Sequence, residues 1–177
     1  MMKDIFKPVI VLASICLAVT MLLAFVNELT LPVIVKAEEA AAAAARSEVL
    51  KNAKSFEAVT VSDLPEGVTE IYKGDNGSGY VVLTQSKGYG GTVRLICGIH
   101  TDGTIEAVKI LSHSETSGVG TKAVDNSSGY RDKFIGISKN TVEQVDTVTG
   151  ATISSKAIKT GVSSALQAYE LIKEAGA

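Results

Sequence analysis

The stretch TVRLICGIHTDGTIEAVKIL, residues 92–111, decides the fold. In its first half every second residue is apolar, which is the pattern of a β-strand with one buried face. These apolar residues are Val93, Leu95, Cys97 and Ile99. The polar segment Thr101-Asp102-Gly103 interrupts the pattern as a turn, and residues 104–111 continue as a second strand. The stretch therefore predicts a β-hairpin.

The segment before this hairpin extends the same architecture. Strands are expected from Phe56 onward, because the helical character of the preceding residues ends there. Residues 70–73 and 79–84 flank the turn sequence Gly74-Asp75-Asn76-Gly77 and predict another hairpin. Two consecutive hairpins indicate an antiparallel sheet.

The segment after the hairpin is predicted to end in a helix. A short helix is expected over residues 119–124, followed by a strand or edge segment over residues 141–145. A long helix is expected from about Ile153, with apolar residues along one side. The predicted fold class is therefore α+β, an antiparallel sheet with a long C-terminal helix.

The N-terminal part contains an uncharged apolar segment. Residues 9–26 read VIVLASICLAVTMLLAFV, and a helix of this length reaches about 27 Å, close to the thickness of the bilayer core. Lys3 and Lys7 precede it, so the positive-inside rule places the N-terminus in the cytoplasm. A cleaved signal peptide is the alternative, but the segment is long and lacks a small-residue cleavage site. A lipoprotein signal at Cys16 would need a smaller residue than Ile15 before it. A single uncleaved anchor is favoured.

Four regions are expected along the chain. They are a cytoplasmic N-terminus over residues 1–8, a transmembrane anchor over 9–31, a juxtamembrane helix over 32–54 and an extracytoplasmic domain over 55–177. The juxtamembrane segment is rich in alanine, the best helix former, and is interpreted as a spacer without chemistry.

Composition excludes several functions. The chain of 177 residues has a net charge of −2, 5% aromatic residues and no tryptophan, so it has no nucleic-acid footprint. Its two cysteines lie far apart and predict no disulfide scaffold, and two histidines cannot form a His-rich metal site. The common hydrolase, zinc-protease and redox C-x-x-C motifs are absent.

Three glycine-bearing segments remain as candidates for chemistry. They are Gly88-Tyr89-Gly90-Gly91-Thr92, the loop over residues 113–120, and residues 146–155 at the start of the last helix. Each has an ordinary structural interpretation, namely a bulged loop, a solvated loop and a capped helix start. The third also has a functional one, because unpaired amides and the positive dipole end at a helix N-terminus bind phosphate.

The third segment is where the chain resembles a known family. Thr149-Gly150-Ala151-Thr152 is similar to the [Ser/Thr]-Gly-Ala-Thr motif of the covalent FMN-binding domain family, and the other two segments follow that family's order. The resemblance implies that a flavin transferase, using FAD and magnesium, joins FMN through its phosphate to Thr152. It also implies contacts from residues of all three segments. These residues are Asp146, Thr149, Gly150, Ala151, Ser154, Ser155, Tyr89, Gly90, Gly91, Glu115, Thr116 and Gly118.

The resemblance assigns roles within this set. Asp146 is expected to belong to the sequence that the transferase reads. The isoalloxazine would lie against the loops of Tyr89 and Glu115-Thr116, whose polar groups are expected to hydrogen-bond its edge. Lys156 and Lys159 could steer the phosphate. No catalytic residue and no metal ligand is predicted. Ser117 stands where the family often has proline.

The order of anchor and domain resembles the G subunits of Rnf-type complexes, which are ion-translocating ferredoxin:NAD oxidoreductases. It is also similar to the C subunit of the sodium-translocating NADH:quinone reductase, although that subunit is usually longer. This resemblance implies an electron-transfer subunit in the cell (inner) membrane, with the other membrane subunits and the transferase as partners. Two alternatives stay open: a stand-alone anchored flavoprotein that passes electrons to external acceptors, and a flavin-free anchored binding module.

Overall fold

The computed structural model describes residues 2–61 and 63–175. The chain divides into two compact units, Met1–Ala40 and Ala41–Ala177. The first unit consists of one helix, the larger part of α1 (Met2–Val49). Within the described residues, α1 is the single helix whose length and apolar composition would let it cross a membrane. The hydroxyls of Ser14 and Thr20 donate to the carbonyls four residues earlier, so these polar groups are satisfied inside the helix.

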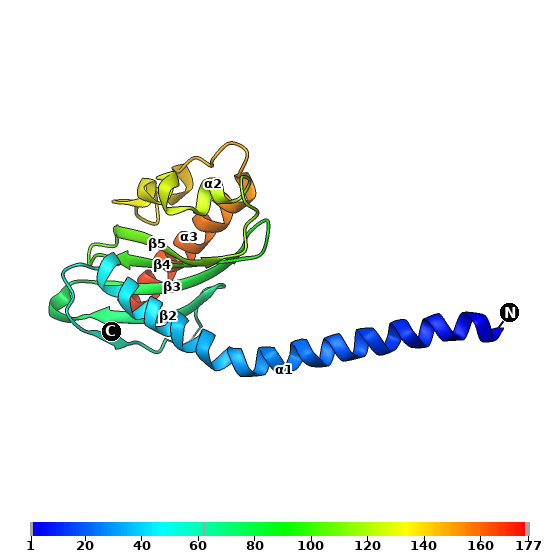
Figure 1. Ribbon diagram of the computed structural model, residues 1–177. Coiled ribbons are helices and arrows are strands. Elements are labelled where there is room, and N and C mark those ends of the chain that lie inside the picture. Colours follow the sequence, from blue (N-terminus) through cyan, green and yellow to red (C-terminus); the bar gives the residue numbers. More distant parts are fainter. Residues whose placement is uncertain (1, 62, 176–177) are drawn as a thin grey trace. The chain divides into compact units, whose positions relative to one another are not determined.

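The second unit is built on a five-stranded antiparallel sheet in which each strand pairs with the next (Figure 1). Its strands are β1 (Phe56–Ala58), β2 (Val68–Gly74), β3 (Tyr80–Lys87), β4 (Thr92–Ile99) and β5 (Ile105–His113). The two predicted hairpins are confirmed as β2–β3 and β4–β5. The 3₁₀ turn η1 (Asp75–Gly77) closes the first of them.

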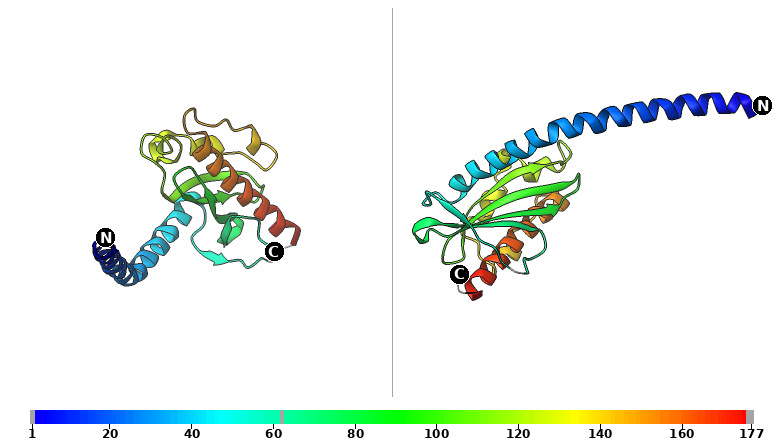
Figure 2. Two further views of the ribbon diagram at one scale, coloured as in Figure 1. Left: turned by 90° about the vertical axis from the view of Figure 1, so that its right-hand side faces the viewer. Right: turned by 90° about the horizontal axis from the view of Figure 1, so that it is seen from below.

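The long helix α3 (Thr152–Ala175) covers one face of the sheet (Figure 2). The predicted apolar stripe of this helix packs on the alternate apolar residues of β4, a contact that the sequence analysis did not assign. The buried members of this stripe are Ile158, Val162, Ala165, Leu166, Tyr169 and Ile172. Gly161 lets the helix come close, because a Cβ there would stand 2.8 Å from a methyl group of Leu95.

The other face of the sheet is covered by the end of α1 and the residues that follow it. Ala42, Ala45, Val49 and Leu50 are buried against Val81, Leu83 and Ile96. The sequence interpretation of residues 32–54 as a spacer is therefore wrong for the part from Ala41 onward, which completes the core. The physical reason is that β3 and β4 are apolar on both faces, so both faces need a cover.

The segment between β5 and α3 is irregular. It contains α2 (Thr121–Val124), η2 (Asn126–Ser128), η3 (Arg131–Phe134) and η4 (Val142–Gln144). The short helix predicted near residues 119–124 is confirmed as α2. The strand predicted over residues 141–145 is wrong, because the amide of Gln144 bonds the carbonyl of Thr141 at 3.0 Å and closes a 3₁₀ turn.

Candidate functional site

The three glycine-bearing segments meet at one end of the sheet. β3 and β5 run in the same direction, because both are antiparallel to β4, so the residues after Lys87 and after His113 leave the sheet at the same end. The start of α3 lies beside them (Figures 1 and 2). A cavity of about 350 Å³ opens there. Its lining residues are Tyr89, Val119, Gly150, Ala151, Thr152, Ile153 and Ser154.

Thr152 is the first residue of α3 and is exposed to the cavity. Gly150 before it has a φ of +80°, a conformation that favours glycine and turns the chain into the helix. Within the described residues, the amides of Thr152, Ile153 and Ser154 have no hydrogen-bond acceptor. The hydroxyl of Thr152 thus stands among free donors at the positive end of a 24-residue helix.

The turn before Thr152 is held by Ser155. The Ser155 hydroxyl accepts a hydrogen bond from the Val148 amide at 3.0 Å and donates one to the Ala151 carbonyl at 2.9 Å. The Ala151 amide in turn donates to the Val148 carbonyl at 3.0 Å. The Ser155 side chain is fully buried, so its hydroxyl acts within the protein and fixes the loop that presents Thr152.

Glu115 joins all three segments. Its carboxylate accepts hydrogen bonds from the amide of Tyr89 at 2.9 Å and from the amide of Gly90 at 3.3 Å. The hydroxyl of Ser154 donates to the same carboxylate at 2.8 Å. Glu115 is 8% exposed, although it lies on a loop. The carboxylate that was expected at the ring edge of a flavin is therefore occupied by donors of the protein.

The cavity has an apolar rim. Tyr89 is 62% exposed, Val119 42% and Ile153 53%, and all three line the opening. Large exposed apolar side chains that gather around a cavity mark a binding surface. Val119 and Ile153 were not among the predicted residues. The sequence signal for Val119 is an apolar side chain between two glycines. The signal for Ile153 is an apolar side chain in the first turn of α3 that lies outside the apolar stripe.

Other predicted residues lie outside the cavity lining and shape the loops. The carbonyl of Thr116 accepts the amides of Val119 and Gly120 at 3.1 Å each. The amide of Gly118 donates to the Thr121 hydroxyl at 2.9 Å. In the β3–β4 turn, the carbonyl of Gly91 accepts the amide of Gly88 at 2.8 Å.

Asp146 and Thr149 are exposed, and neither lines the cavity. Asp146 lies close enough to Tyr130 to act on it electrostatically. Burial raises the pKa of the Tyr130 hydroxyl, and the charge of Asp146 raises that pKa further. Tyr130 lies under the start of α3, where its hydroxyl is 3.5 Å from the carbonyl of Ser155. Asp146 thus stands at the surface of the loop that leads to Thr152.

The sequence analysis did not single out Lys122, a lysine that lies near this loop. Lys159, which was expected to steer a phosphate, is paired with Glu143 at 3.0 Å. Lys122 on α2 instead places its ammonium beside the turn, 3.7 Å from where a Cβ on Gly150 would stand. Lys122 is exposed and makes no ion pair with any described residue. Lys122 and Thr152 lie far apart in the sequence, so the sequence alone did not indicate that Lys122 is close to the turn before Thr152.

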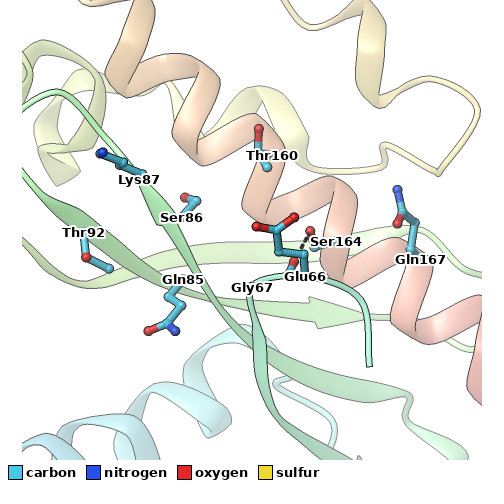
Figure 3. Close-up of a pocket in the computed structure, with 9 residues that line it drawn as sticks. All are labelled: Glu66, Gly67, Gln85, Ser86, Lys87, Thr92, Thr160, Ser164 and Gln167. Atoms are coloured by element: carbon cyan, nitrogen blue, oxygen red, sulfur yellow. Dashed lines mark hydrogen bonds between the residues drawn. The ribbon is translucent and has the colours of Figure 1, made fainter. Parts of the chain in front are cut away.

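A larger hollow of about 570 Å³ lies elsewhere, between β3 and α3 (Figure 3). Its lining is mostly neutral and polar, and the hydroxyl of Ser164 there donates to the carbonyl of Glu66 at 2.9 Å. None of the predicted site residues lines it. The smaller cavity, where an exposed hydroxyl, free amides and an apolar rim converge, is the candidate site.

Comparison with known proteins agrees with this geometry. The family model of the FMN-binding domain matches residues 88–167, which include all three glycine-bearing segments. The model of the RnfG N-terminal region matches residues 1–49. The chain is 33% identical to the G subunit of the Na⁺-translocating ferredoxin:NAD⁺ oxidoreductase complex of Acetobacterium woodii, over 95% of this chain and 93% of that protein. It is 35% identical to the G subunit of an ion-translocating oxidoreductase complex of Methanosarcina acetivorans, over 69% of this chain and 71% of that protein.

The fold, the site and these matches define the class of protein. It is an FMN-binding electron-transfer flavoprotein that acts as a redox subunit of a larger complex. The apolar part of α1 is consistent with a membrane anchor. The chain belongs to the family of G subunits of Rnf-type ion-translocating oxidoreductase complexes.

Proposed function

We propose that this chain carries FMN covalently on Thr152 and passes electrons between neighbouring redox centres of an Rnf-type ferredoxin:NAD⁺ oxidoreductase complex. One observation carries the proposal. The exposed Thr152 hydroxyl lies at a helix start with free amides, at the edge of a cavity with an apolar rim. FMN combines a phosphate, which needs hydrogen-bond donors, with an aromatic ring system, which needs an apolar surface, so it requires these two environments side by side.

The residues present fit both parts of FMN. The amides of residues 152–154 and the Lys122 ammonium would hold the phosphate. A negative group at a helix N-terminus is stabilised by about 0.3–1 kcal/mol. Tyr89, Val119 and Ile153 would contact the isoalloxazine. FMN supplies one- and two-electron redox chemistry when bound, and the protein supplies its position and surroundings.

Thr152 would be the attachment point. Its hydroxyl oxygen would replace AMP at the FMN phosphorus of FAD, so that one phosphoester bond forms and one phosphoanhydride bond breaks. AMP and the hydroxyl proton leave, and the chain gains the mass of FMN minus water. A covalent link would keep the flavin on an extracytoplasmic domain, where lost FMN could not be replaced.

The test is the intact mass and in-gel flavin fluorescence of the denatured full chain, after coexpression with a flavin transferase. The wild-type chain should gain FMN minus water on the peptide that contains Thr152. Thr152→Ala should abolish the gain, whereas Thr149→Ala, which leaves the acceptor in place, should retain at least part of it. An unmodified wild-type chain beside an active transferase would contradict the covalent assignment.

The subunit assignment is favoured over a stand-alone flavoprotein. The similarity to the Acetobacterium woodii protein covers nearly the whole chain, including the N-terminal helix. For a stand-alone flavoprotein, similarity over the FMN-binding domain alone would be expected. The remaining membrane subunits of such a complex are therefore the proposed partners.

A further inference from the structure

We infer that Glu115 is the positioning residue of the site: its buried carboxylate aligns the Tyr89 turn with the first turn of α3, and through Ser154 it sets the direction in which Thr152 is presented. This inference rests on the proposed function. It differs from the expectation that Glu115 contacts the flavin ring, because the carboxylate is already engaged within the protein.

The hydrogen bonds explain why a glutamate stands here. Oε1 accepts the Tyr89 amide, and Oε2 accepts both the Gly90 amide and the Ser154 hydroxyl. All three partners are donors, so the site needs acceptors on both terminal atoms. A glutamine of the same shape has a single acceptor oxygen and would turn its NH₂ group toward another donor. A carboxylate is thus the side chain that satisfies all three groups.

The glycines of the neighbouring loops leave room for this carboxylate. A Cβ on Gly88 would stand 1.9 Å from Oε1 of Glu115, and a Cβ on Gly120 would stand 2.0 Å from Oε2. A Cβ on Gly90 would stand 2.3 Å from the carbonyl oxygen of Ser114. Three glycines from two loops therefore surround the Glu115 side chain and its backbone. Gly88 and Gly120 leave room for the buried carboxylate, and Gly90 lets its turn approach the backbone of residues 114 and 115.

Ser154 transmits the position to the acceptor threonine. It lies in the first turn of α3, two residues after Thr152, and is 1% exposed. Its hydroxyl is 2.8 Å from the Glu115 carboxylate, an ordinary distance for an O–H···O hydrogen bond. The bond of Ser154 to Glu115 and the two bonds of the Ser155 hydroxyl together fix the first turn of α3.

The test measures the rate of flavin attachment to the purified full chain in detergent, with a flavin transferase, FAD and Mg²⁺. Glu115→Gln should lower kcat for attachment about tenfold, with a much smaller change in the KM for the chain, because the acceptor is misaligned while the motif that the transferase reads is intact. Ser154→Ala should lower kcat severalfold. The double variant should lose little more than Glu115→Gln alone, because the two residues act through one bond.

Two controls separate positioning from stability and charge. Ile172→Val removes a buried methylene group at the far end of α3, so it should lower the melting temperature of the protein and leave the attachment rate unchanged. Glu143→Gln removes an exposed carboxylate of the loop before Thr152 and should also leave it unchanged. If Glu115→Gln does not fold, Ser154→Ala keeps the carboxylate in place and still tests the bond.

The outcomes are distinguishable. A wild-type chain that takes up no flavin would contradict the proposed function itself. A wild-type chain that is modified, with Glu115→Gln modified at the same rate, would overturn the role of Glu115 alone. An unchanged attachment rate with a shifted flavin absorbance spectrum would overturn it in favour of direct ring contact.

Discussion

The Lys122 ammonium lies beside the turn that carries Thr152, although the two residues come from different elements. We expect Lys122→Gln to slow flavin attachment by about two- to fivefold at low salt, because one exposed charge near a phosphate is worth about 0.3–1 kcal/mol. The loss should shrink as salt is added, since the pair is exposed to solvent.

The control for Lys122 is Lys156→Gln, which removes an exposed lysine from the first turns of α3. It should have the smaller effect, because no described contact brings Lys156 to the Gly150 turn. Initial rates at two salt concentrations measure both variants. Equal losses for the two variants would mean that general surface charge, and not the position of Lys122, attracts the phosphate.

At the scale of elements, the end of α1 and strand β4 depend on each other. Gly98 on β4 lies directly under the helix end, and a Cβ there would stand 1.9 Å from the carbonyl oxygen of Val49. Because that neighbour is backbone, the helix end must move. We expect Gly98→Ala to cost about 1–3 kcal/mol of stability and to expose the buried residues Ala45 and Leu50.

Hydrogen exchange distinguishes this displacement from a general loss of stability. In Gly98→Ala, amides of residues 42–50 should exchange faster than in the wild-type chain. Gly77→Ala is the control, because its added Cβ meets nothing within 4 Å and costs only the strain of a φ of +67°. Unchanged exchange over residues 42–50 would show that the sheet does not need this cover.

The same interface shows where prediction from the sequence stops at this scale. The alternation of Val93, Leu95 and Cys97 predicted one buried face of β4, and α3 covers it. Ile96 on the opposite face is also fully buried, and it packs against the end of α1. The sequence of this helix end is rich in alanine and does not distinguish it from an exposed spacer. Small residues such as Ala45 are equally suited to an exposed stalk and to close packing, so only the contact distinguishes them.

At the scale of the whole molecule, the proposed orientation places Lys7 inside the cell and the FMN-binding domain outside. A cysteine introduced as Ser127→Cys, in an exposed turn, should react with a membrane-impermeant maleimide on intact cells. A cysteine introduced as Phe6→Cys, which keeps the charges of Lys3 and Lys7, should react only after the membrane is opened. The reverse pattern would contradict the orientation.

The natural cysteines favour this experiment. Cys97 is fully buried, and burial raises the pKa of its thiol, so it should stay unreactive in the folded protein. Cys16 lies in the apolar part of α1 and can be replaced by serine. Labelling of the chain that retains only Cys97 provides the background.

The sequence by itself determined the apolar segment, the two hairpins, the last helix and the motif around Thr152. These features depend on local alternation, helical periodicity and turn chemistry, which act between residues close in the chain. The tertiary structure alone decided that Glu115 bonds Tyr89 and Ser154, which lie 26 and 39 residues away. It also decided that Lys122 stands beside Gly150 and that the end of α1 belongs to the core. The sequence around a hydrogen-bond donor or a small apolar residue does not indicate which distant residue it will contact. These contacts can therefore be identified only in the folded structure.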